Sequence, residues 1–397
     1  MATNDPAAYR VSNIDYVAEK EEVTKGTPAG VPDTYIKIQD FTLKPNLNKA
    51  GDTRLAGHKA ARSNLLRGLR NYTGTQDAYA EPNYMYNMLS KMFARSATTG
   101  SGPYTTTFDP LSETEPKSYT VDKAINGRVF RYSGVEAQTM PFSYEEGDNV
   151  AHNVQELMAT NSFYDGKIVS VTGAEPSTIV LGTGYDPSPT ALLVVGDTLS
   201  GYDKSAGTFL DLTVASVVDG TSITTTEDAT SLIAGDLIYI KPQLVSEISW
   251  LAETDLFEWG QLTVKKGATL GTVASFCAEP DTTISLIHTI DEKKCAGVLY
   301  LSGLRRLTSD AEITINRVVD TGTDYAEFID NDQVVYQFIW TAGVNSLTIT
   351  FYAKVENAEI TNVSNELESQ TFTVKPVVDT STGNFFTISL LNSRDTT

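Results

Sequence analysis

The chain has 397 residues, a formal net charge of -20 and two cysteines. Its length is sufficient to bury a sizeable core and favours two domains. Two cysteines are too few for a disulfide framework. Cys277 and Cys295 could pair, but we expect two reduced, partly buried thiols. The acidic balance argues against a protein whose whole surface grips DNA; it suits a basic partner, or a surface that repels polyanions.

The first residues show no export signal, because MATNDPAAYR lacks a basic region followed by an apolar one. No run of about 18 apolar residues occurs in the chain, so no transmembrane helix is expected. Residues 1 to about 32 are polar and contain three prolines. They are predicted to form an extended arm.

Residues 34–70 join a strand pattern, TYIKIQDFTLK, to a concentrated positive segment. Seven basic residues stand against one acid in residues 44–70: Lys44, Lys49, Arg54, Lys59, Arg62, Arg67 and Arg70. Such a segment is typical of phosphate or nucleic-acid binding. Binding to single strands would favour aromatic stacking platforms between the basic residues, yet residues 44–70 contain no Phe, Tyr or Trp. The following LRGLRNYTGTQDAYAE predicts a short strand or turn and a polar linker.

The strongest helix pattern is EPNYMYNMLSKMFARS, with Pro82 suited to the first turn. One apolar stripe follows the helical spacing: Met85, Met88, Leu89, Met92 and Phe93. We expect this stripe to face the core rather than to form a binding groove. Residues 96–117 are predicted to be a loop, Asn126-Gly127 to close a hairpin, and residues 154–159 to form a short helix.

Residues 165–243 differ from the rest of the chain. Short apolar strands recur about every 10 to 15 residues between Gly, Asp and Pro turns, which is typical of a small all-β sandwich or barrel. This stretch holds ten acids and three bases. We predict an inserted domain at 165–243 between two halves of a larger core, residues 1–164 and 244–397.

The C-terminal half returns to longer alternating strands. EITINRVV, VVYQFIWT and SLTITFYAKV are predicted strands separated by Asp, Gly and Asn turns. A last hairpin is expected about Ser381-Thr382-Gly383. Its two arms would carry Phe372, Val374 and Pro376, and Phe386, Ile388 and Leu390.

No pattern of catalytic or metal-binding residues is readable. His58, His152 and His288 are scattered, and neither HExxH nor CxxC occurs. The acids Asp320, Asp324, Asp330 and Asp332 lack the glycine and glutamate positions of a calcium loop. LGTGYDPS lacks the Lys-Ser/Thr ending of a phosphate loop, and no GxSxG elbow is present. We therefore predict no enzyme, no metal and no cofactor.

Three stretches carry a family resemblance: VTKGTPAGVPDTYIKIQDFTLKPNLNK, SYTVDKAINGRVFRYSGVEAQTMPFSYEEGDNV, and AEITNVSNELESQTFTVKPV with NFFTISLLN. In their order along the chain they resemble the tail tube proteins of long-tailed, non-contractile bacteriophages. The resemblance leaves out residues 165–243, which depart from the simplest family plan.

The resemblance implies a mainly β fold: a β-sandwich or barrel core with a flanking α-helix and a long loop, here with the inserted all-β domain. Six copies would form a ring whose inner strands join into one β-barrel, and rings would stack into a tube. The implied partners are further copies of the chain, the tail terminator, tail-tip or baseplate proteins and the tape measure protein. The implied place is the virion tail, assembled in the host cytoplasm, with no membrane and no catalytic residue.

Within that resemblance the basic segment has a different role. An acidic lumen would repel phosphates and let the genome pass without specific binding. Lys44, Lys49, Arg54, Lys59, Arg62, Arg67 and Arg70 would then form an arm that contacts acids on the next ring, and the insert would project from the outer wall. The alternatives are a tail-end or baseplate ring component of the same fold, a cell-surface carbohydrate-binding β-module protein, and a protein whose basic arm binds DNA.

Overall fold

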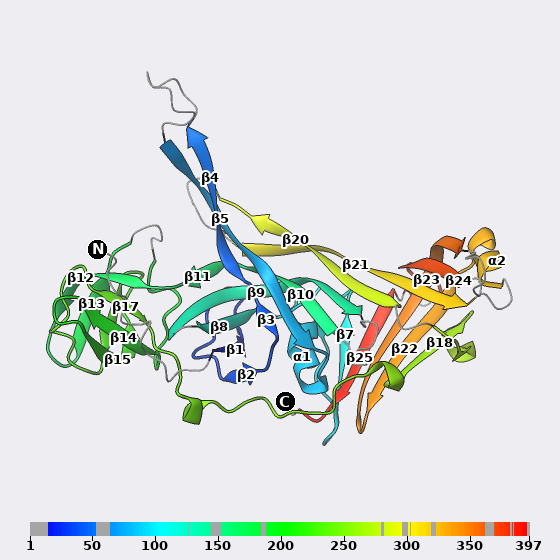
Figure 1. Ribbon diagram of the computed structural model, residues 1–397, viewed down its shortest axis with the longest axis horizontal. Coiled ribbons are helices and arrows are strands. Elements are labelled where there is room, and N and C mark those ends of the chain that lie inside the picture. The colour runs from blue at the N-terminus through cyan, green and yellow to red at the C-terminus, as the bar shows by residue number, and fades with distance from the viewer. Residues whose placement is uncertain are drawn as a thin grey trace.

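The computed structural model describes residues 15–52, 64–125, 127–143, 152–183, 188–278, 282–295, 301, 303–318, 323–361, 369–381, 383 and 385–394. These residues form a mainly β structure with a closed six-stranded barrel, as predicted for the fold class. Figure 1 shows the barrel at one end of the long axis and α2 (Thr323–Asp330) at the other. Within the described residues, no helix is long and apolar enough to cross a membrane.

One antiparallel ladder runs through most of the molecule. Its strands, in spatial order, are β4 (Lys44–Asp52), β5 (Asn64–Tyr79), β10 (His152–Ala159), β9 (Arg128–Ser143), β20 (Thr283–Lys293), β21 (Gly303–Val318), β24 (Ser369–Pro376), β23 (Asn345–Thr361), β22 (Val334–Ala342), β18 (Leu262–Gly267) and β19 (Ala274–Ser275). The long β23 also pairs with β25, and further strands follow from it: β25 (Phe386–Asn392), β7 (Tyr104–Asp109) and β6 (Ala94–Arg95). This branching gives the core two layers.

A smaller sheet branches from the first half of β9. It contains β2 (Thr34–Ile36), β1 (Tyr16–Glu21), β8 (Tyr119–Ile125) and, on the other edge of β9, β11 (Asn161–Phe163). The short β3 (Asp40–Phe41) pairs with β5. Because β9 belongs to both sheets, it connects the ribbon side of the molecule to the barrel side (Figure 1).

The barrel lies within the residues predicted to be an insert. Its strands are β12 (Gly166–Thr172), β13 (Ser177–Leu181), β16 (Ser222–Thr225), β15 (Thr208–Val217), β14 (Thr198–Asp203) and β17 (Leu237–Ile240). Closure leaves this unit without free sheet edges. Its apolar cluster, which includes Leu199, Leu212 and Ile238, is continuous with Tyr16 and Tyr35 of the smaller sheet.

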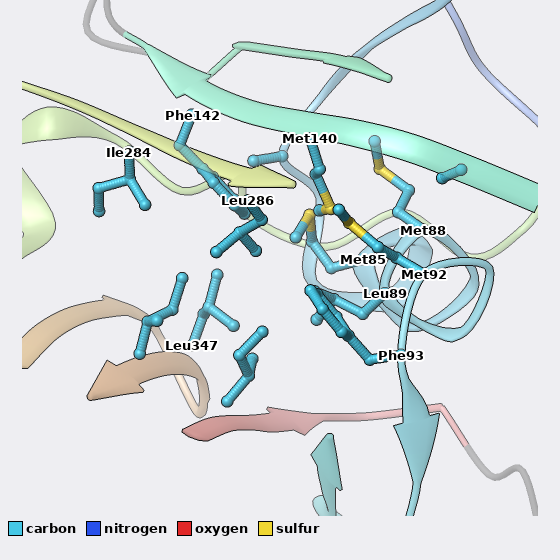
Figure 2. Packing of buried hydrophobic residues seen from close by; sticks show 14 of the residues in the cluster. Met85, Met88, Leu89, Met92, Phe93, Met140, Phe142, Ile284, Leu286 and Leu347 are labelled. Atoms are coloured by element: carbon cyan, nitrogen blue, oxygen red, sulfur yellow. The ribbon is translucent and has the colours of Figure 1, made fainter. Parts of the chain in front are cut away.

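The helix α1 (Pro82–Ser90) lies in the core, and all nine of its residues are buried. Figure 2 shows Met85, Met88, Leu89, Met92 and Phe93 together, facing side chains of β9, β20 and β23. Those side chains are Met140, Phe142, Ile284, Leu286 and Leu347. The predicted core-facing stripe is confirmed, although the helix ends at Ser90 and the last two residues of the stripe follow it.

The structure contradicts the helix predicted at residues 154–159, which belong to strand β10. Two of its inward-facing side chains are polar and buried: Asn153 donates to the Pro141 carbonyl and Gln155 to the Met88 carbonyl. Exposed Val154 and Glu156 alternate with them. Inward and outward side chains therefore alternate as in any strand, but a hydrophobicity pattern does not reveal the alternation because these inward side chains are polar.

In three other segments the structure has more β-strand than was predicted. β7 lies inside the predicted loop 96–117, with Thr106 and Phe108 facing inward. β5 extends over 16 residues where a short strand and linker were expected, because pairing with β4 and β10 extends it. β1 lies inside the predicted N-terminal arm, whose residues 1–14 are outside the described part.

The last predicted hairpin is also wrong. β24 and β25 exist as strands, but they do not pair with each other. They lie one after the other along the same edge of β23, where residues 346–351 pair with β25 and residues 353–361 with β24. The hairpin about Asn126-Gly127 is confirmed by the β8–β9 register and by the positive φ of Gly127. Cys277 and Cys295 are unpaired, as expected, but exposed rather than partly buried.

Candidate assembly interface

The described parts of the basic segment, residues 44–52 and 64–70, form a projecting two-stranded ribbon rather than a loop. β4 pairs with β5 from Lys44 opposite Thr73 to Asp52 opposite Asn64, with one bulge between Leu47 and Lys49. Figure 1 shows the two strands extending well beyond the rest of the molecule. A lone two-stranded ribbon is only marginally stable in water. Its two long backbone edges are therefore natural places for another chain to bind.

Four of the seven predicted arm residues lie on the ribbon: Lys44, Lys49, Arg67 and Arg70. The register places Lys49 opposite Arg67 and Leu47 opposite Arg70, and Lys44 is exposed at the base. Like charges at opposite positions of a ladder disfavour it, so an acidic partner would stabilise the ribbon. The other three, Arg54, Lys59 and Arg62, lie outside the described residues.

The base of the ribbon is fixed to the body by close backbone packing. The Tyr132 hydroxyl on β9 donates to the Leu43 carbonyl over 2.8 Å, and the Lys123 ammonium donates to the Phe41 carbonyl. A Cβ atom on Gly74 would lie 2.4 Å from the backbone N and Cα of Leu43. Only glycine fits there without moving the chain.

The ladder presents a second strand edge on the far side of β20. Residues 303–314 of β21 pair with β20 on one side, whereas on the other side β24 covers only residues 313–318. Within the described residues, no strand pairs with the outer edge of residues 303–312. The run of strands from β4 to β21 therefore ends in one edge at the ribbon and another at β21.

A buried ion triad joins the barrel to the body. Arg131 on β9 donates to both carboxylate oxygens of Asp122 on β8, over 2.7 and 2.8 Å. On the barrel side, Arg131 Nη1 donates to the Asp197 carboxylate over 2.6 Å and to the Leu192 carbonyl over 3.1 Å. The Arg131 side chain is 0% exposed. Burial alone would lower the pKa of Arg131, but the two carboxylates outweigh it and raise the pKa.

Sequence reasoning missed this triad, although one signal was available. Arg131 stands in the predicted strand RVFRYSGV, and an arginine buried in a strand needs anionic partners. The register supplies one directly, since Asp122 lies opposite Arg131 in the β8–β9 ladder. Asp197 is 66 residues away in the chain and could not be assigned from spacing.

Among the described residues, one histidine can be placed with its contacts. His288 is buried, its Nδ1 lies 2.6 Å from the Met92 carbonyl, and burial lowers its pKa to about 4. His58 and the side chain of His152 lie outside what the structure describes. Over the described residues, no group of three His, Cys, Asp or Glu side chains could hold a metal ion.

Comparisons with known proteins do not assign the chain to a family. No family model matches the chain. No curated protein matches it either. Among solved structures, one matching chain belongs to a "Virion of native gene transfer agent (GTA) particle", with 16% identity and a TM-score of 0.23 over 29% of this chain and 90% of that chain. A similarity at that TM-score supports no statement about the function of this chain.

Proposed function

We propose that the chain is a structural virion protein that polymerises as stacked hexameric rings into the tail tube of a phage, a channel through which the genome passes. The observation that carries the proposal is the ladder with one edge at the ribbon and another at β21. Strand edges invite pairing with another chain. Joining the two edges between neighbouring copies closes a ring and removes both edges, as closure does in any β-barrel.

The direction of the ribbon suits stacking. In Figure 1 the ribbon rises on one side of the molecule, and residues 241–261, which join the barrel to β18, run along the opposite side. The part from 244 to 261 carries Glu247, Glu253, Asp255 and Glu258 and no Lys or Arg. Glu253 pairs with Lys37 of its own chain. Head-to-tail stacking would bring the basic ribbon of one ring against the acidic side of the next.

The charge of the whole chain supports the same function. A chain with a net charge of -20 would repel a polyanion such as DNA. DNA could then slide through a lumen lined by such chains, whereas a basic lumen would bind the DNA through counterion release. The barrel fits the outer wall, because a folded unit within the lumen would block it. The tail terminator, tail-tip or baseplate proteins and tape measure protein are the further partners of such a tube.

The test is a charge reversal in the basic segment, at Arg62 and Arg67; of these two, Arg67 lies on β5 of the ribbon. In Arg62→Glu/Arg67→Glu the monomer should fold, but electron microscopy should show few or no tubes, because the ribbon no longer attracts acids. The matched control is Lys167→Glu/Lys204→Glu, the same charge change on the barrel, which should form normal tubes. Asp255→Lys/Glu258→Lys added to the ribbon variant should restore some assembly. Normal tubes from the ribbon variant would contradict the electrostatic role of the ribbon.

A gel-shift assay distinguishes this proposal from the alternative in which the basic segment binds DNA. The proposal predicts no salt-dependent shift of duplex DNA by the purified protein. A shift that weakens steeply as salt rises, and that disappears in Arg62→Glu/Arg67→Glu, would show a DNA-binding arm instead.

A further inference from the structure

A fully buried polar cluster lies beneath α1, apart from the proposed assembly surfaces. Glu19 comes from β1, Gln76 from β5, Tyr84 and Asn87 from α1, and Lys91 follows the helix directly. Each of the five is at most 2% exposed. A lysine and a glutamate in such a place are unusual, since burying charges costs several kcal/mol per ion.

The contacts place an amine, an amide and a carboxylate together. The Lys91 ammonium contacts Glu19 Oε1 and lies 3.2 Å from the amide oxygen Oε1 of Gln76. The Gln76 amide nitrogen donates to the same Glu19 oxygen over 3.3 Å. One carboxylate oxygen therefore touches both the amine of Lys91 and the amide nitrogen of Gln76.

The surroundings favour the reactive form of the lysine. Burial lowers the pKa of Lys91, although Glu19 opposes the effect. The Tyr84 and Tyr119 rings lie 5.7 and 5.4 Å from Lys91 Nζ. A neutral amine is a nucleophile, and a carboxylate in contact with both nitrogens can act first as general base and then as general acid.

We propose that Lys91 and Gln76 form an intramolecular isopeptide bond after folding, with Glu19 as the proton carrier. As a neutral amine, Lys91 Nζ attacks the side-chain carbonyl carbon Cδ of Gln76 and gives one proton to the Glu19 carboxylate. Glu19 passes a proton to the Gln76 nitrogen, the Cδ–Nε2 bond breaks, and ammonia leaves. The new bond joins Nζ to Cδ, the electrons balance without an oxidant, and Glu19 ends as it began.

Gln76 is the acceptor rather than Asn87. The Asn87 amide donates to the other Glu19 oxygen, Oε2, over 3.2 Å, whereas the carbonyl oxygen of Gln76 is the one within hydrogen-bond distance of Lys91 Nζ. The product would join β5, the strand that continues into the ribbon, to the end of α1. It would resist forces that pull the ribbon out of the body.

The test is mass spectrometry of the purified full-length chain, and it is independent of tube formation. The linked chain should be lighter than its sequence mass by one ammonia. Trypsin should fail to cut after Lys91. Cleavage before Asp77 should leave peptides 71–76 and 77–95 joined, whereas an unlinked chain separates into peptides 71–76 and 77–91.

Variants identify the groups. Glu19→Gln keeps the shape but removes the proton carrier, and Gln76→Met removes the acceptor, so both should show the full sequence mass and normal cleavage after Lys91. Lys266→Arg is the matched control, since Lys266 also pairs with a glutamate, Glu327, and it should keep the ammonia loss. A wild-type chain of full sequence mass with separable peptides would overturn the proposal, as would a link to Asn87.

Discussion

Replacing Arg131 by methionine should strongly destabilise the chain where the barrel meets the body. The change removes all three charge-assisted hydrogen bonds, of 2.7, 2.8 and 2.6 Å. It leaves Asp122 and Asp197, which are 5% and 1% exposed, without their cation. Breaking a buried pair by removing one partner costs about 3–5 kcal/mol. Urea unfolding followed by fluorescence should show this loss at pH 7.

The loss should depend on pH and should be partly reversible. Burial raises the pKa of Asp122, and Arg131 opposes that rise. Without Arg131 the Asp122 carboxyl takes up a proton more readily in the folded state, so the variant should regain stability relative to wild type as pH falls. Asp122→Asn/Asp197→Asn added to Arg131→Met removes the buried negative charges and should recover part of the loss. A free energy of unfolding for Arg131→Met within about 1 kcal/mol of wild type would refute the idea that the triad holds the barrel.

Substitutions at two further positions, Gly74 and Glu136, should change the free energy of unfolding. Gly74→Ala should cost about 1–3 kcal/mol in urea unfolding, because its Cβ would overlap the Leu43 backbone. Gly260→Ala, where a Cβ meets nothing within 4 Å, should change stability little, and equal effects would contradict the packing at the ribbon base. Burial raises the pKa of Glu136 from 4.5 to about 7 despite the Lys25 ammonium 2.7 Å away. The folded state therefore binds the proton more tightly, and stability is lost as pH rises from about 4.5 to 7. Relative to Glu136→Gln, the wild-type unfolding free energy should fall by roughly 3 kcal/mol over that window, and parallel pH profiles would show that the buried carboxyl does not titrate there.

Strands with an apolar inner face could be predicted from the sequence, and strands with a polar inner face could not. In β22 the inward residues Tyr336, Phe338 and Trp340 alternate with less buried ones, so the period is plain. In β10 the inward positions include Asn153 and Gln155, whose amide nitrogens donate to backbone carbonyls. Their burial depends on partners far away in the chain, which no local pattern reveals.

Strand pairing was harder to predict than strand position. The segments of β24 and β25 were found, but their short connection favoured a hairpin, and the structure instead places both along β23. In the candidate assembly interface, composition identified the basic segment, and the register shows that part of it is a paired ribbon. The barrel joint through Arg131 and Asp197 depends on tertiary proximity and was not predictable from spacing.

Electron microscopy of the purified wild-type chain tests the central proposal most directly. If the chain is a tail tube subunit, concentrated protein should form long hollow tubes of uniform diameter, with a regular axial repeat of stacked six-fold rings. A chain that stays monomeric at all concentrations, or forms only isolated rings, would contradict its role as the tube subunit.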